Sequence, residues 1–211
     1  MPSRNRERAR PGRSLPANVF LNVPYDRRSE KLYLAYVCGV CSFGLIPRAA
    51  VELRESARRL DRILAIIKTC RYSINDLSRV ELDRTPPPTP RFNMPFELGL
   101  SIGWDKFGKG RHGWFTFESK EFRMAKSLSD LNGTDPYVHH GRIDGIFGEL
   151  CNAFVRLERQ PTVPQMWRVY RDVKNSVPEI LRTAGARSVF TPRVFRDLCV
   201  VASAAAIRHV C

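Results

Sequence analysis

The 211-residue sequence lacks any long apolar run and any leader-like beginning. No stretch approaches the roughly 20 apolar residues that a membrane span requires. Residues 1–13 are rich in arginine and contain no apolar segment, unlike a secretory signal. These absences predict a cytoplasmic protein without a membrane partner. What is present, 43% hydrophobic and 27% charged residues, is typical of a globular chain with a buried core.

Several chemical signatures are also missing. There is no glycine-rich phosphate loop, which excludes a Rossmann dehydrogenase or a kinase. No Ser-His-Asp order and no cluster with metal-ligand spacing stands out, so neither a metal nor a cofactor is predicted. The six cysteines include Cys38 and Cys41 at a redox spacing, but no second pair completes a zinc site. Because this pair falls late in an apolar helical run, we interpret both thiols as small buried hydrophobic groups.

The formal net charge of +14 raises the question of nucleic acid. A basic surface attracts any anion, including nucleotides, and does not specify a partner. Part of the charge lies between Arg4 and Arg13, inside a segment, residues 1–17, that we predict to be a disordered basic tail. The rest is spread along the chain. Nucleic-acid binding through the tail is therefore kept only as an alternative, which a steep loss of binding with salt would support.

Short apolar runs alternate with segments of helical spacing at the distances expected of crossover connections. That alternation predicts an α/β domain with a doubly wound, mostly parallel sheet. A proline-rich segment, 85–90, is not expected to form regular structure. Asn93 is expected to cap the helix that follows it. Strands are expected at 19–23, 45–51, 72–76, 113–117 and 136–139, and helices at 30–43, 60–67, 94–104 and 142–157.

The character of the chain changes after Pro161. Residues 18–160 are predicted to form the α/β domain, and residues 161–211, which show only helical patterns, a helical C-terminal extension. Breaks in these helices are expected at Pro178, Gly185 and Pro192. The extension is expected to pack on the domain or on a second subunit. An apolar face outside a core needs a partner, so the run 198–207 favours a homo-oligomer.

The expected sheet also indicates where chemistry should occur. In open α/β sheets, ligands bind beyond the carboxyl ends of the strands. Three segments are therefore expected to converge: 24–26, 76–78 and the start of the helix that carries Glu97. Each carboxylate also has a simpler interpretation. Glu97 could contribute favourable electrostatics of under about 1 kcal/mol near a helix start, and Asp76 could be a turn or cap residue.

Three segments together resemble a family of bacterial TIR-like proteins, which are related in fold to the nucleoside 2-deoxyribosyltransferases. The resemblance covers roughly residues 18–157. Its most specific part is Glu-Leu-Gly on the helix after the third strand, where both groups keep their catalytic carboxylate. The segments are Val19-Phe-Leu-Asn-Val-Pro-Tyr-Asp26, Cys70-Arg-Tyr-Ser-Ile-Asn-Asp-Leu-Ser78 and Arg91-Phe-Asn-Met-Pro-Phe-Glu-Leu-Gly-Leu100.

The resemblance implies a flavodoxin-like sheet of five strands in the order 2-1-3-4-5. It also implies cleavage of an N-glycosidic bond, in NAD or a related nucleotide, and a role in bacterial anti-phage defence or signalling. NAD would then be a substrate and not a cofactor. Glu97 matches the family's catalytic glutamate, and Asp76 is expected to act with it. Substrate contacts are expected from Tyr25, Asp26, Arg91, Phe92 and Asn93.

The chemistry is consistent with these residue types. Cleavage of a ribosyl C–N bond builds positive charge on the sugar, which a carboxylate beneath C1′ stabilises or captures as an ester. Asn93 departs from the acidic residue that suits a deoxyribosyltransferase at this position, which argues against transfer between free nucleosides. The alternative hypothesis is a nucleotide-sensing or self-associating scaffold module without catalysis.

Overall fold

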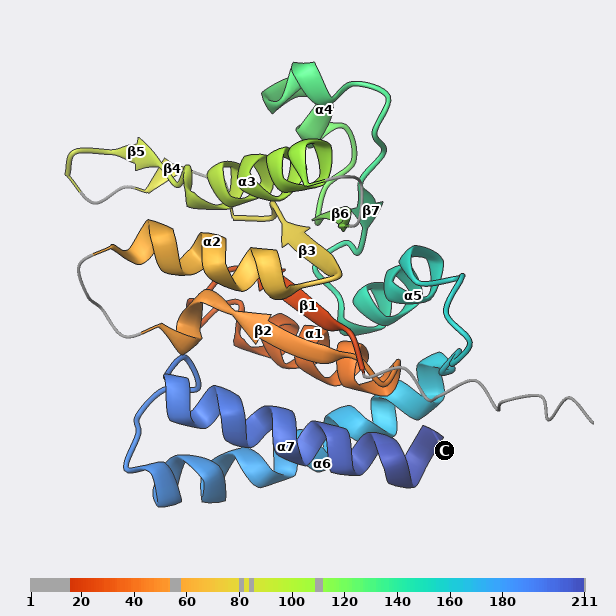
Figure 1. The fold of residues 1–211 in the computed structure, drawn as a ribbon. Coiled ribbons are helices and arrows are strands. Elements are labelled where there is room, and N and C mark those ends of the chain that lie inside the picture. The colour runs from red at the N-terminus through yellow and green to blue at the C-terminus, as the bar shows by residue number, and fades with distance from the viewer. Residues whose placement is uncertain (1–15, 54–57, 80–81, 84–85, 109–111, 211) are drawn as a thin grey trace, which may run out of the picture.

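The computed structural model describes residues 16–53, 58–79, 82–83, 86–108 and 112–210. Five strands form one parallel sheet in the order β2-β1-β3-β6-β7 (Figure 1). This order confirms the predicted flavodoxin-like topology. Most of the predicted basic tail, residues 1–15, lies outside the described residues. The strands are Asn18–Asn22 (β1), Ile46–Ala49 (β2), Tyr72–Asp76 (β3), Gly113–Glu118 (β6) and Tyr137–Val138 (β7).

Both faces of the central strands are buried, as expected when helices cover a parallel sheet on each side. On β1, Val19 and Leu21 point toward one face, whereas Phe20 points toward the other. The face of Leu21 is covered by α1 (Glu30–Ser42) and α5 (Ile143–Ala153). The face of Phe20 is covered by α2 (Arg59–Thr69) and α3 (Asn93–Phe107).

Two local predictions between β3 and α3 were wrong. The proline-rich segment contains β5 (Thr89–Pro90), which pairs antiparallel with β4 (Leu82–Asp83). A proline is tolerated there because an edge strand of two residues needs few ladder hydrogen bonds. Asn93 is also not a cap: it begins α3, Phe92 occupies the cap position, and no side chain caps the helix. The start of α3 is held by a tertiary contact instead, from Asn22 to the carbonyl of Met94.

The C-terminal helices α6 (Val163–Ala184) and α7 (Pro192–Val210) pack on each other and on α1, forming a third layer of helices (Figure 1). The described contacts of this extension therefore lie on the chain's own domain. Within the run 198–207, Leu198, Ala202, Ala205 and Ala206 are buried in the same core cluster as α1. That apolar face is covered within one chain, and the homo-oligomer stays a prediction.

The predicted helix breaks have different outcomes. Gly185 ends α6 in a left-handed conformation (φ 62°), and Pro192 begins α7, both as predicted. Pro178 does not break α6, which continues to Ala184. A proline removes one hydrogen bond from a helix, but buried Val173 and Ile180 on either side of it keep α6 packed on the core.

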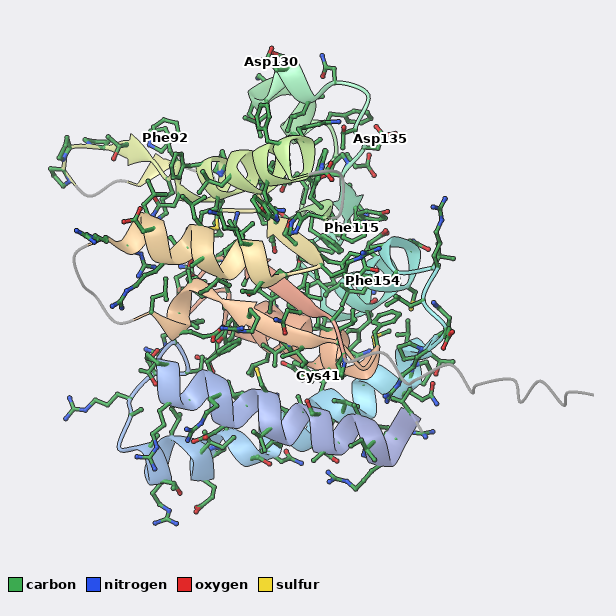
Figure 2. The ribbon with its side chains drawn as sticks, viewed as in Figure 1. Cys41, Phe92, Phe115, Asp130, Asp135 and Phe154 are labelled. Carbon is green, nitrogen blue, oxygen red and sulfur yellow. The ribbon has the colours of Figure 1, made fainter. Side chains whose placement is uncertain are left out.

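The cysteine pair on α1 behaves as small buried hydrophobic groups, as predicted. Cys38 and Cys41 are both free thiols and both buried. Burial raises the pKa of Cys41 to about 12, so its thiol is uncharged at neutral pH. Cys41 lies where α1 meets α7 (Figure 2), with its sulfur 3.9 Å from the carbonyl oxygen of Cys199. In the described part of the chain, no helix combines the length and apolar character that crossing a membrane would need.

Candidate active site

The carboxyl edge of the sheet brings α3 against the ends of β1 and β3. The side-chain amide of Asn22 donates to the carbonyl of Met94 at 2.8 Å and to the side-chain oxygen of Asn75 at 3.0 Å. Asn22 and Asn75 are neighbours in the parallel register of β1 and β3. Since Glu97 lies one helical turn after Met94, this contact places Glu97 at the edge where ligands bind in such sheets.

Glu97 is an unusual carboxylate because it is buried and poorly paired. Glu97 is 7% exposed, and its Oε2 atom has no hydrogen-bond partner among the described residues. Burial raises the pKa of Glu97 to about 7, and the positive charge of Arg59 on α2 opposes only part of that rise. A carboxylate placed for helix-dipole stabilisation would lie in the first turn and keep a low pKa, whereas α3 has no acid in its first turn. That simpler interpretation therefore does not fit.

Tyr25, in the loop after β1, is close enough to Glu97 for the charge of the carboxylate to act on its hydroxyl. Burial raises its pKa above the ordinary tyrosine value, and the nearby charge of Glu97 raises it further. The Tyr25 hydroxyl donates to the carbonyl of Leu21 at 2.9 Å, and its ring packs edge-on against Tyr33 and Phe190. The ring is thus held in place by α1 and by the segment between α6 and α7, so it forms a fixed wall next to the carboxylate.

Asp26 connects three segments of the edge. Its Oδ1 accepts from the backbone N–H groups of Arg28 and Ser29 at 3.0 and 3.1 Å, which fixes the entry to α1. Its Oδ2 lies 3.1 Å from Nε of Arg79 and 3.9 Å from Nη1 of Arg91. These contacts position the loops after β1 and β3 and the segment before α3. The substrate roles expected of Asp26 and Arg91 stay predictions.

The expected substrate residues at the start of α3 are on the surface. Phe92 is 66% exposed and lies near β5 (Figure 2). Asn93 is exposed as well. Asn93 is four residues before Glu97, so the two side chains fall on one side of the helix. Stacking of a base on Phe92 and a polar contact from Asn93 stay predictions.

Asp76 ends β3, but it does not join Glu97. Along β3, Ile74 and Asp76 point toward α1, whereas Ser73 and Asn75 point toward the α3 side. No hydrogen bond or ion pair between described residues connects the two carboxylates. The structure therefore brings both to the same edge of the sheet but on opposite faces, and the expected joint action of Asp76 and Glu97 stays a prediction.

Asp76 is fully buried and saturated with hydrogen bonds. It accepts from the Tyr36 hydroxyl at 3.0 Å and from the Ser78 backbone N–H at 2.8 Å, and His139 Nε2 lies 3.5 Å away. Burial alone would raise the pKa of Asp76, but hydrogen bonds from His139 and Ser78 hold it below the ordinary value. Tyr36 was not predicted as a site residue. Its signal was that it is one of two tyrosines in a largely apolar helix, where a buried hydroxyl usually has a partner.

The contact between Ser78 and His139 is not a nucleophile–base pair. His139 Nε2 lies 3.0 Å from Ser78 Oγ, and its Nδ1 accepts from the Gly141 backbone N–H at 3.1 Å. Because Nδ1 is the acceptor, Nε2 carries the proton and cannot remove one from Ser78. Within the described residues, no group of three or more His, Cys, Asp or Glu side chains is arranged to hold a metal ion.

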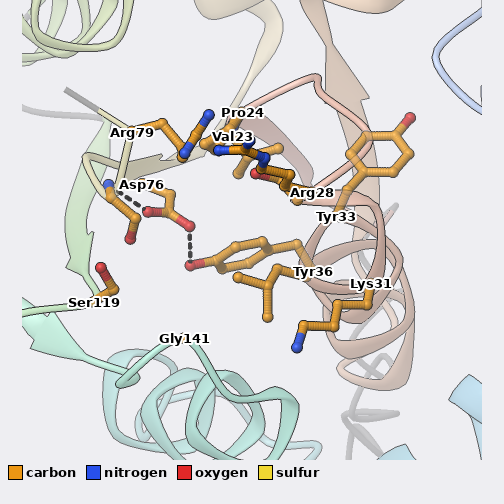
Figure 3. Close-up of a pocket in the computed structure, with 13 residues that line it drawn as sticks. Val23, Pro24, Arg28, Lys31, Tyr33, Tyr36, Asp76, Arg79, Ser119 and Gly141 are labelled. Carbon is orange, nitrogen blue, oxygen red and sulfur yellow. Dashed lines mark hydrogen bonds between the residues drawn. The ribbon is translucent and has the colours of Figure 1, made fainter. Parts of the chain in front are cut away.

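A cavity of about 240 Å³ lies beside Asp76, between the first turn of α1 and the ends of β1, β3 and β6 (Figure 3). We name it the α1 cavity.

Comparisons of the chain with protein-family models, with curated proteins and with solved structures found no match. Besides the resemblance of three sequence segments, the geometry of the edge is the guide to function.

The buried state of Glu97 predicts a pH-dependent effect on stability. Its folded pKa of about 7 exceeds the ordinary 4.5, so the protonated form stabilises the fold below about pH 4.5, and this contribution is lost as pH rises through about 7. Glu97→Gln removes the ionisation. We compare the unfolding free energy of the variant with that of wild type at each pH. The difference, variant minus wild type, should be about 2 kcal/mol larger at about pH 8 than at about pH 5.5. Urea unfolding at both pH values measures it, and an equal difference at both would contradict the buried carboxylate.

Proposed function

We propose that this chain cleaves the N-glycosidic bond of NAD or a related nucleotide, with Glu97 as the catalytic carboxylate. The observation that carries the proposal is the buried Oε2 of Glu97, without a protein partner, at the carboxyl edge of a parallel sheet. A buried acceptor without a partner is costly to the fold, and such groups are concentrated at functional sites. The resemblance to TIR-like proteins and deoxyribosyltransferases supports the same residue.

The environment of Glu97 suits stabilisation of a cationic transition state. When the C1′–N bond of NAD breaks, its electron pair goes to the nicotinamide nitrogen, and positive charge develops on the ribose. An ionised carboxylate in a poorly hydrated site stabilises that charge more than one in water would. Water oxygen then bonds to C1′ and loses a proton to solvent. Tyr25, held by Leu21, Tyr33 and Phe190, provides the rigid wall beside this reaction.

The pKa of Glu97 determines how the rate of this reaction should change with pH. Only the ionised carboxylate stabilises the ribosyl cation, and the pKa of about 7 leaves it partly protonated at neutral pH. The pH dependence of kcat/KM reports the free enzyme's groups. We therefore expect kcat/KM for NAD to rise with pH and to level off above about pH 8.

The test uses the full chain with NAD, adenosine monophosphate and adenosine, and follows the free base by chromatography. We expect base release from NAD or from the nucleotide. If all three substrates keep their base over hours at high protein concentration, the proposed function is wrong. A rate that falls as pH rises would contradict the role given to ionised Glu97.

A further inference from the structure

The α1 cavity is a second feature of the carboxyl edge, on the face of the sheet opposite Glu97. Its walls come from the end of β1, the end of β3, the end of β6 and the first turn of α1 (Figure 3). At about 240 Å³ it is smaller than the roughly 300–1,000 Å³ of pockets that enclose a whole small molecule. The cavity therefore suits one part of a larger ligand, or a small anion.

The charges around the α1 cavity are mainly positive. Arg28, Lys31 and Arg79 line it, and Arg79 is paired with Asp26. Arg28 and Lys31 are exposed and form no ion pair with another described residue. The single acidic lining residue is Asp76, whose oxygens are occupied by contacts with Tyr36, Ser78 and His139. Because Asp26 neutralises Arg79, the lining has two further cations against one carboxylate, and its net charge is positive.

Hydrogen-bond donors accompany these cations. Ser29, Ser78 and Ser119 line the α1 cavity, but the hydroxyls of Ser29 and Ser119 already donate to neighbouring carboxylates at 3.3 and 3.4 Å, so Ser78 supplies the hydroxyl donor. Ser29 is also the N-cap residue of this 13-residue helix, and its side chain makes no capping hydrogen bond, so it does not cap the N–H groups of Glu30 and Lys31 at the helix start. Uncapped N–H groups and the positive end of the helix dipole both favour an anion. Cations, the Ser78 hydroxyl and helix N–H groups together form a donor set of the kind that binds phosphate in proteins.

We propose that the α1 cavity binds the phosphate group of a nucleotide or free phosphate. The proposal concerns binding only and does not depend on the activity of Glu97, which lies on the other face of the sheet. The nucleotide can be the substrate, with its phosphate anchored beyond the reacting sugar, or a separate ligand. In both cases the phosphate is the recognised group, and Arg28 and Lys31 are the residues that recognise it.

Calorimetric titration of the full chain tests this proposal with three probes: inorganic phosphate, adenosine monophosphate and adenosine. The titrations are performed near 0.15 M salt, where long-range attraction to a chain of net charge +14 is largely screened at distances beyond about 8 Å. We expect the monophosphate to bind and adenosine to bind at least about tenfold more weakly. Phosphate binding as tight as the monophosphate identifies free phosphate as the ligand, and weaker phosphate binding identifies the nucleotide.

Two double variants that each remove two positive charges distinguish binding in the α1 cavity from attraction to the positive chain as a whole. The double variant Arg28→Gln/Lys31→Gln removes both uncompensated cations of the cavity. The control Arg171→Gln/Lys174→Gln removes the same charge from exposed positions on α6. We expect the cavity variant to weaken binding of the monophosphate by about tenfold or more and the control to leave it within about twofold. Thermal unfolding of both variants confirms that they are folded.

Three outcomes would overturn the proposal: no binding of either phosphate probe, equal binding of adenosine and its monophosphate, or equal weakening by the two double variants. Repeating the titration with Glu97→Gln keeps this test separate from the proposed function. Phosphate binding that persists in that variant supports the α1 cavity even when no base is released from any substrate.

Discussion

Replacing Glu97 with glutamine is expected to lower the rate of base release by about 100-fold or more, because the charge opposed to the ribosyl cation is lost while the shape is kept. The amide fits the same space, and the buried oxygen that lacks a partner is not replaced by a cavity. The measurement is kcat/KM for the substrate that the wild-type chain cleaves. Since no metal or cofactor is invoked, the whole decrease should come from the carboxylate.

The control for this prediction is Glu121→Gln, which removes an equal charge from an exposed position after β6. We expect its kcat/KM to stay within about twofold of wild type. Equal activity of wild type and Glu97→Gln would remove Glu97 from the mechanism. The stability prediction strengthens the comparison: the glutamine variant should be more stable than wild type above about pH 7, so lost activity could not be explained by unfolding.

The fold was predictable because its strands are encoded by local apolar runs. Val19–Val23 precedes the first helical segment, Tyr72–Asp76 lies between two others at crossover distances, and right-handed crossovers allow few topologies. The carboxyl edge followed from the same parallel arrangement. Positions of Tyr25, Asp26, Asp76 and Glu97 near that edge could therefore be predicted from the order of elements alone.

The faces of the sheet could not be assigned from the sequence. When both faces of a strand are buried, its residues show no polar alternation to distinguish them. Asp76 and Glu97 therefore looked like neighbours, although the side chain of Asp76 points to α1 and Glu97 lies on the α3 side. The pKa of Glu97 was also not predictable, because it depends on burial by elements that are distant in sequence.

The place of α6 and α7 had a sequence signal that was not used. Residues 33–42 of α1 are almost all apolar or aromatic on every side of the helix, with no polar stripe for solvent. A helix of that kind must be covered on its outer side as well as by the sheet. The two amphipathic helices of the C-terminal extension provide this cover. Their packing on α1 buries the outer side of α1 and their own apolar faces together.

Removal of α6 and α7 by ending the chain after Gln160 is accordingly expected to abolish folding. The deletion removes buried side chains that include Val169, Val173, Phe195 and Leu198, and exposes the outer side of α1. Each buried side chain of this size contributes about 1.5–3 kcal/mol, and a domain has only about 5–15 kcal/mol of net stability. Far-UV circular dichroism and urea unfolding of the shortened chain measure the effect.

Two single substitutions on α7 give the same prediction in graded form. Leu198→Ala, at a fully buried position, should cost about 2–5 kcal/mol of unfolding free energy. Val200→Ala, two residues away and 63% exposed, should change it by less than about 0.5 kcal/mol. A shortened chain that unfolds cooperatively at the wild-type midpoint would show that α1 needs no cover from α7. The expected result instead makes α6 and α7 part of the fold, so any self-association must be measured on the full chain.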